Sequence, residues 1–257
     1  MANKRKKAPH SYREREYRTI PVTDGLLSYQ VKVRETDLQI MAPIEVTEAA
    51  TNLVIQARNS LESYISRQRN FLEALHPLAD DPTAPFLVRE MLKAGSSAGV
   101  GPMAAVAGVI AEYVGKGLME LEGCNEVVVE NGGDIFLHRQ KDSTVAIYAG
   151  ESPLSYRIGI RLAAAKMPAG ICTSSGTIGH SLSLGRADSV TVVAPSTALA
   201  DAAATRLGNS VSKSGEMDQA LELAENIDGL DGVLIVVGEE LGAWGEIELV
   251  ETGKTFS

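Results

Sequence analysis

The chain has 257 residues, of which 44% are hydrophobic and 22% charged, and its net charge at pH 7 is −9. This composition excludes a wholly disordered chain and suffices for one large domain or two small ones to bury a core. The two cysteines, Cys124 and Cys172, are too few for a disulfide framework and lack the spacing of a metal-binding pair.

Basic residues are concentrated at the start of the chain, where the first twenty positions hold seven Lys or Arg against two Glu. We interpret residues 1–18 as a basic arm, either solvated or bound to an anionic partner, and residues 19–257 as one domain. Nucleic acid is a disfavoured partner because the rest of the chain is acidic and offers only four Phe and one Trp for stacking. No apolar run follows the arm, and the long uncharged stretch 94–111 is rich in Gly and Ala, so we expect a cytoplasmic protein with no membrane segment.

The first half of the chain predicts a strand pair followed by helices. Residues 17–43 alternate apolar and polar side chains, as a half-buried sheet does. Thr47 is the expected N-cap of a long helix that ends near Leu75, and Pro85 is expected to begin a short helix. A loop containing Gly99 and Gly101 then leads into a helix that has Pro102 at its first position.

Two explanations remain open for the glycines of that loop. Free backbone N–H groups at a helix start attract phosphate, which would make Gly99 and Gly101 cofactor-binding residues. Close packing of the helix on a sheet would require small residues equally. The spacing matches neither a Walker A loop nor a dinucleotide-binding fingerprint.

The second half predicts mostly strands. Strand 125–130 meets Asn131-Gly132-Gly133-Asp134, which forms either a tight hairpin or a bend that contacts a ligand. Further strands are expected at 143–150 and 156–163, a turn-bearing pair at 168–185, and a helix at 216–227 before a last strand and hairpin. Helices followed by hairpins occur twice, which predicts an α+β fold with an antiparallel or mixed sheet and allows an internal duplication.

A β-branched strand after Asp188 runs into an alanine-rich helix that carries Asp201 and Thr205. Four residues apart, these two side chains lie on one helix face and form half of an oxygen site for a hard cation. The alternative is that both satisfy local backbone groups.

Cys172 lies in the 168–185 pair. If its turn centres on Gly176, Cys172 faces His180 across the ladder, and a thiol beside an imidazole suits nucleophilic or persulfide chemistry. The alternative is a buried thiol that acts as a small hydrophobic group.

Three segments in this order, GVGPMAAVAGVIAEYVG, EVVVENGGDIFL and TSSGTIGHSLS with VTVVAPSTALADAAAT, resemble the FAD:protein FMN transferase (ApbE) superfamily. The RETDLQI and YREREYR segments are similar to an ApbE-like branch of archaea and anaerobic bacteria. The resemblance covers nearly the whole chain and implies an ApbE-like fold.

The resemblance also implies a site that binds FAD or FMN with Mg²⁺. It places Asp201, Thr205 and the carbonyl near Pro102 on the metal, and His180 at the family histidine. It places the following residues around the cofactor: Gly132, Gly133, Asp134, Thr173, Ser174, Ser175 and Gly176. Where the transferases carry a lysine, this chain has Pro102-Met103-Ala104, and the Asp-Pro that follows the family histidine is replaced by Ser181-Leu182.

Three functions follow from these patterns. The first is Mg²⁺-dependent binding of a flavin nucleotide or another small phosphate-bearing ligand, with FMN transfer to a protein acceptor. The second is sulfur transfer through a persulfide on Cys172 in sulfide assimilation or homocysteine formation. The third is a nucleotide-binding module without catalysis. A homodimer is one arrangement that the sequence allows.

Overall fold

The protein is described here from a computed structural model that covers residues 25–175, 187–211 and 213–253. Its centre is an antiparallel sheet of eight strands in the order β1-β2-β3-β4-β7-β8-β9-β10. The strands are β1 (Leu27–Val33), β2 (Thr36–Ala42), β3 (Val127–Asn131), β4 (Asp134–His138), β7 (Ala169–Ser174), β8 (Ser189–Ala194), β9 (Gly232–Val237) and β10 (Glu240–Gly245). The predicted α+β class with an antiparallel sheet is confirmed.

The two halves of this sheet have the same topology. In the first half a hairpin, β1–β2, leads through helices to a second hairpin, β3–β4. In the second half the pair β7–β8 leads through helices to β9–β10. The duplication suggested by the sequence is therefore visible as a repeated order of elements, and the pairing of β4 with β7 joins the halves.

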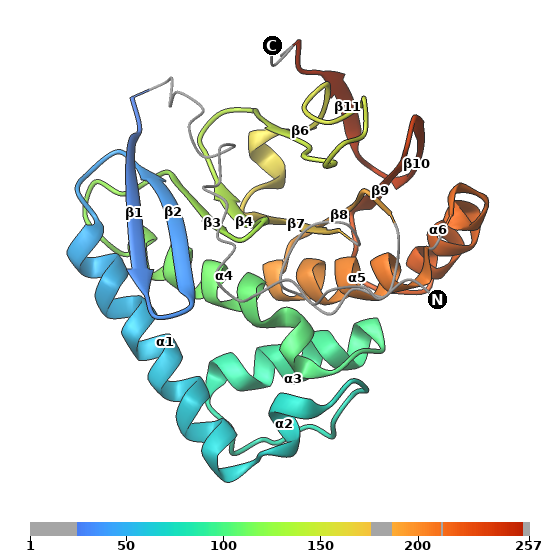
Figure 1. Cartoon of the computed structure of the whole chain (residues 1–257). Coiled ribbons are helices and arrows are strands. Elements are labelled where there is room, and N and C mark those ends of the chain that lie inside the picture. The colour runs from blue at the N-terminus through green and yellow to red at the C-terminus, as the bar shows by residue number, and fades with distance from the viewer. Residues whose placement is uncertain (1–24, 176–186, 212, 254–257) are drawn as a thin grey trace.

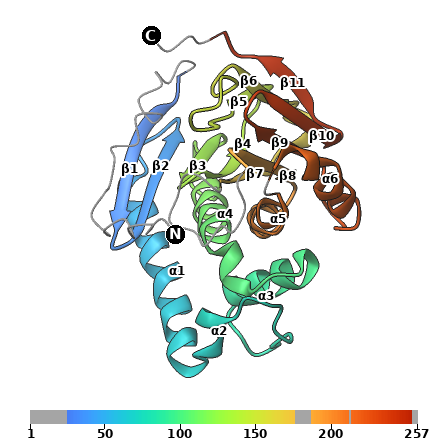
Figure 2. The same cartoon turned by 45° about the vertical axis from the view of Figure 1, so that its right-hand side comes forward.

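The helices pack on one face of the sheet (Figures 1 and 2). They are α1 (Thr47–Arg67), α2 (Asn70–Glu73), α3 (Phe86–Ala98), α4 (Val106–Met119), α5 (Thr197–Ser210) and α6 (Met217–Glu225), with short 3-10 turns η2 (Pro102–Ala105) and η4 (Ser214–Glu216). A third 3-10 turn, η3 (Ala164–Lys166), lies on the opposite face of the sheet. Helix α4 packs under β3 and β4, and α5 under β7 and β8. The two helices therefore lie side by side beneath the centre of the sheet.

A second sheet of three strands, in the order β11-β6-β5, covers the other face. Its strands are β5 (Ser143–Ala146), β6 (Ile158–Leu162) and β11 (Glu248–Glu251). Because the central strands are covered on both faces, β8 is buried at every position, whereas the edge strand β1 alternates. Two hydrophobic clusters result, one on each face of the large sheet.

The helix expected from Thr47 to about Leu75 ends earlier, at Arg67, and Thr47 is its first residue rather than its N-cap. After the break, Phe71 in α2 is fully buried and packs edge-to-face on Tyr64, with ring centroids 5.2 Å apart. Leu75 is 71% exposed. In a continuous helix Phe71 would lie on the same face as Tyr64 but about 10 Å further along the axis. The break therefore brings the two rings into contact and buries Phe71.

In the described part of the chain, no single helix is long and apolar enough to cross a membrane. Among the described residues, only the α3 segment joined to the Pro102–Met119 segment has the length and apolar composition of a membrane span, and that pair is bent by 107°.

Candidate functional site

The Gly-Gly bend is a tight hairpin, as predicted. Asn131 pairs with Asp134, and Gly132 and Gly133 adopt φ values of 73° and 111°, a region that glycine favours. The N–H of Gly133 donates to Glu130 Oε1 at 2.8 Å, and the N–H of Thr173 in β7 donates to the Gly133 carbonyl at 3.3 Å. The bend is therefore held by its own strand and by the neighbouring strand.

This bend also contacts the first turn of α4. Asn131 Nδ2 donates to the Ala107 carbonyl at 3.0 Å. On the other side of that turn, the N–H of Gly108 donates to Asp201 Oδ2 at 2.8 Å. The bend, the start of α4 and the Asp201 face of α5 are thus brought together.

Gly108 permits this close approach of α4 and α5. A Cβ atom at Gly108 would lie 2.4 Å from the Thr197 carbonyl oxygen and 2.8 Å from Asp201 Cβ, which is closer than real Cβ contacts. The sequence analysis did not single out Gly108, although the small residues of this helix indicated close packing.

Each of the two helices receives a carboxylate from the other at its N-terminus. Asp201 of α5 accepts from the start of α4, and Glu112 of α4 accepts from Thr197 N at 2.8 Å and Ala198 N at 3.3 Å at the start of α5. We call these two interactions the reciprocal caps. Anionic groups are favourable at helix N-termini, so the α5 start is already occupied by the protein's own carboxylate.

Burial dominates the electrostatics of Asp201. Desolvation raises its pKa to about 7, although hydrogen bonds from the backbone N–H groups of Gly108 and Ala107 oppose the rise. Thr205, one turn later, is partly buried. In this arrangement Asp201 does satisfy backbone groups, which was the alternative explanation, and it does so beside the Gly-Gly bend.

Asp134 and Cys172 face each other across β4 and β7. Burial, followed by the negative charge of Asp201, raises the pKa of Asp134. The pKa of the Cys172 thiol is raised first by burial and then by the charges of Asp134 and Asp201. The Cys172 side chain is fully buried and its Sγ lies 3.4 Å from the Thr197 carbonyl oxygen. A buried thiol held in its protonated form is a poor nucleophile.

The expected pairing of Cys172 with His180 is wrong. In β8 the partner of Cys172 is Val192, so the register of the β7–β8 pair is not the one that a turn centred on Gly176 would give. Gly176 and His180 themselves lie outside the described residues. The register is fixed by β8, which pairs with β7 from Val190 to Ala194 and with β9 from Ser189 to Val193.

The polar end of β7 lies over the last turns of α5. Thr173 Oγ1 and Thr191 Oγ1 are 2.9 Å apart, and a Cβ atom at Gly208 would lie 3.0 Å from Ser174 Oγ. Ser175 follows β7 directly. Ser174 is therefore placed along the same helix that carries Asp201 and Thr205. The Thr173 side chain points to the opposite face of the sheet, as do those of Ile171 and Leu234 in the cluster of that face, so the structure separates it from Asp201.

The glycine loop before η2 serves packing at one position. The Gly101 N–H donates to the Leu75 carbonyl at 3.0 Å, and a Cβ there would lie 1.8 Å from the Ala74 carbonyl oxygen. Gly99 ends α3 with φ 72°. Pro102 is buried at the first position of η2, as predicted for that residue, and η2 packs against α5.

Arg206 is a further candidate for the site, which sequence reasoning missed. It follows Thr205, is exposed, and its Nε would lie 4.0 Å from a Cβ atom on Gly99. Within the described residues it makes no hydrogen bond or ion pair. A guanidinium next to the glycine loop, with no partner among the described residues, is suited to bind phosphate.

The described residues contain no group of three or more His, Cys, Asp or Glu that could hold a metal by themselves. Asp201 and Thr205 supply oxygen atoms only, which are ligands for Mg²⁺ rather than for a transition metal. Because Mg²⁺ usually keeps several waters and shares substrate phosphates, this pair fits such an ion only together with a phosphate-bearing ligand.

The fold is that of the ApbE flavin transferases. It is similar to the apo flavinyl transferase ApbE of Pseudomonas stutzeri, with a TM-score of 0.58 and 15% identity over 85% of this chain and 93% of that one. The flavin transferase ApbE of Vibrio cholerae is also similar, with a TM-score of 0.54 and 14% identity over 85% and 96% of the two chains.

Sequence comparison identifies the family. A family model described as "AbpE bacteria" matches residues 19–242, and the chain belongs to this family. Among its relatives, the UPF0280 protein of Methanococcus aeolicus is 40% identical over 89% of this chain and 94% of its own length. The UPF0280 protein of Methanocaldococcus jannaschii is 43% identical over 81% and 86% of the two chains.

Proposed function

We propose that this protein binds a flavin nucleotide, FAD or FMN, together with Mg²⁺ at Asp201 and Thr205, and that it is a transferase of the flavin-transferase type. The observation that carries the proposal is the position of Asp201. Its carboxylate accepts from the start of α4 beside the Gly-Gly bend, and Asp201 shares a helix face with Thr205.

Arg206 and the glycine loop support a diphosphate ligand. The guanidinium has no protein partner among the described residues and lies next to the Gly99 turn. An arginine side chain can donate two hydrogen bonds to two oxygens of one phosphate. Arg206 can therefore orient a diphosphate so that its other oxygens face Asp201 and Thr205. In this arrangement Arg206 supplies the positive charge that the chain lacks at Pro102-Met103-Ala104.

Bound Mg²⁺ would neutralise the diphosphate and ease attack at phosphorus. The chain's own residues have other tasks. The Gly-Gly bend leaves room for a ligand to approach the backbone, Ser174 adds a hydroxyl beside α5, and α5 holds Asp201 and Thr205 on one face. In FMN transfer from FAD, a hydroxyl of an acceptor protein would attack the FMN phosphorus and AMP would leave.

Titration of the purified full-length chain with FAD, with and without Mg²⁺, tests the proposal through flavin fluorescence and melting temperature. A ligand at a hundred times its Kd stabilises a protein by about 2.7 kcal/mol. We expect such a rise with FAD and Mg²⁺ together, and its metal-dependent part should be lost in Asp201→Asn. Asp218→Asn, which changes an exposed carboxylate on α6, is the matched control.

Arg206→Ala should weaken FAD binding about tenfold, as expected for loss of a charged hydrogen bond. Arg89→Ala, at an exposed arginine on α3, should leave it unchanged. The proposal fails if FAD with Mg²⁺ changes neither fluorescence nor melting temperature. It fails also if Asp201→Asn keeps the full effect of Mg²⁺.

A further inference from the structure

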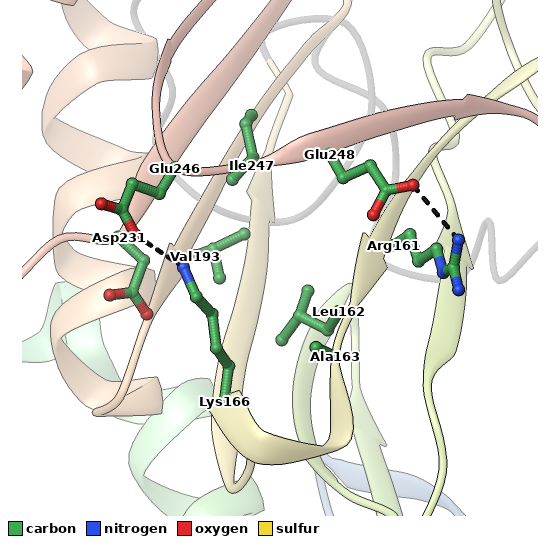
Figure 3. Close-up of a pocket in the computed structure, with 9 residues that line it drawn as sticks. All are labelled: Arg161, Leu162, Ala163, Lys166, Val193, Asp231, Glu246, Ile247 and Glu248. Carbon is green, nitrogen blue, oxygen red and sulfur yellow. Dashed lines mark hydrogen bonds and ion pairs between the residues drawn. The ribbon is translucent and has the colours of Figure 1, made fainter.

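A cavity of about 170 Å³ lies on the opposite face of the large sheet from α4 and α5. It is formed by the end of β6 with η3, by Val193 of β8, and by the chain that links β10 to β11 (Figure 3). Its apolar lining consists of Leu162, Val193 and Ile247, all of which belong to or pack on the hydrophobic cluster of that face. The cavity is therefore separated from Asp201 by the sheet.

The cavity walls are fixed by backbone contacts. The Asp231 N–H donates to the Val193 carbonyl at 2.8 Å, and the Glu246 N–H donates to the Asp231 carbonyl at 2.7 Å. A Cβ atom at Gly232 would lie 2.6 Å from Ile247 Cγ2, and one at Gly245 would lie 2.4 Å from the Asp231 carbonyl oxygen. The Asp231 side chain is thus presented to the cavity from a rigid position.

Among the described residues, the charged side chains on the rim are paired except for one. Arg161 bonds to Asp142 at 3.0 Å and to Glu248 at 3.3 Å, and Lys166 Nζ bonds to Glu246 at 2.8 Å. Figure 3 shows Asp231 beside Lys166, whose ammonium group is directed to Glu246. Within the described residues the Asp231 carboxylate has no hydrogen bond and no ion pair.

Burial raises the pKa of Asp231, the charge of Lys166 opposes the rise, and Glu246 adds to it. The positive charge of Lys166 therefore offsets only part of the cost of burying the Asp231 carboxylate. A half-buried carboxylate without a partner favours a cation that can donate hydrogen bonds.

We propose that this cavity binds a small organic cation, a primary ammonium on a short apolar chain. The ammonium donates to Asp231, and the chain lies on Leu162, Val193 and Ile247. A water molecule takes up about 30 Å³ in the liquid, so the cavity has room for roughly five or six non-hydrogen atoms. The size excludes a flavin nucleotide, and this site is independent of the proposed flavin site.

Ligand-detected NMR of the full-length protein with n-butylammonium tests the proposal. The probes n-butanol, of equal size without charge, and n-butyrate, of opposite charge, are measured at the same ionic strength. We expect binding of n-butylammonium alone, in the millimolar range that is usual for about five non-hydrogen atoms. Sodium, potassium and magnesium chloride are then tested as competitors.

Asp231→Asn should weaken butylammonium binding at least about tenfold, the effect of losing one charged hydrogen bond. Glu248→Gln, a rim carboxylate that already pairs with Arg161, should stay within about twofold. Ala163→Phe fills the cavity from an exposed position and should block binding while Asp231 remains.

Equal binding of butanol, or unchanged affinity in Asp231→Asn or Ala163→Phe, would overturn the proposal. Complete displacement by sodium or potassium at matched ionic strength would also overturn it, because it would assign the site to an inorganic cation.

Discussion

Replacement of Glu112 by alanine tests the reciprocal caps directly. The carboxylate is 12% exposed and accepts from two backbone N–H groups, at 2.8 and 3.3 Å. A hydrogen bond to a charged group contributes about 1.5–3 kcal/mol, and a favourable helix-terminus charge about 0.3–1 kcal/mol. The longer contact is the weaker, so we expect Glu112→Ala to lower the free energy of unfolding by roughly 2–3 kcal/mol.

Urea denaturation with an unchanged m-value is the assay. Glu112→Gln keeps an acceptor oxygen without the charge and should lose about half as much. The control is Lys116→Ala. Lys116 bonds to the other Glu112 oxygen at 2.6 Å but is 56% exposed, so its removal should cost less than about 1 kcal/mol. The reasoning is refuted if Glu112→Ala and Lys116→Ala have the same stability within error.

Three further predictions concern the interior of the site. Gly108→Ala should cost about 1–3 kcal/mol in a thermal or urea melt because its Cβ would overlap Thr197 and Asp201, whereas Gly215→Ala, with open space around it, should change little; equal effects would contradict the packing account. Since the folded-state pKa of Asp201 is about 7, above the usual 3.8, its stabilising contribution is complete below about pH 4 and is lost as the pH rises to about 7. A pKa difference of about three units corresponds to roughly 4 kcal/mol. Between pH 4 and 8, metal-free Asp201→Asn should therefore lose less unfolding free energy than the unchanged protein. If urea denaturation gives the two proteins the same dependence of stability on pH, Asp201 is not the titrating group. Cys124 and Cys172, both buried with raised pKa values, should react with iodoacetamide slowly in the native protein and quickly in urea; rapid native labelling of Cys172 would instead favour sulfur transfer.

The sequence predicted those features that depend on local signals. Asn131-Gly132-Gly133-Asp134 is a hairpin because its glycines supply the positive φ values that a two-residue turn needs. The β-branched run of β8 and the i, i+4 placement of Asp201 and Thr205 likewise follow from short-range periodicity.

Features set by distant contacts were not predictable in this way. The Cys172 register depends on β8 pairing with two neighbours, and the early end of α1 depends on burial of Phe71. Glu112 and Thr197 are 85 residues apart in sequence, so no periodicity relates them. Arg206 was missed because only the folded chain brings it to Gly99.

The reciprocal caps cross the boundary between the topological halves of the molecule. Helix α4 in the first half begins on a carboxylate from the second half, and α5 in the second half begins on a carboxylate from the first. A break in the polypeptide between β4 and β7 would therefore leave each fragment with an uncapped buried helix. We therefore expect neither fragment to fold on its own, and we expect the halves to unfold in a single cooperative transition despite their repeated topology.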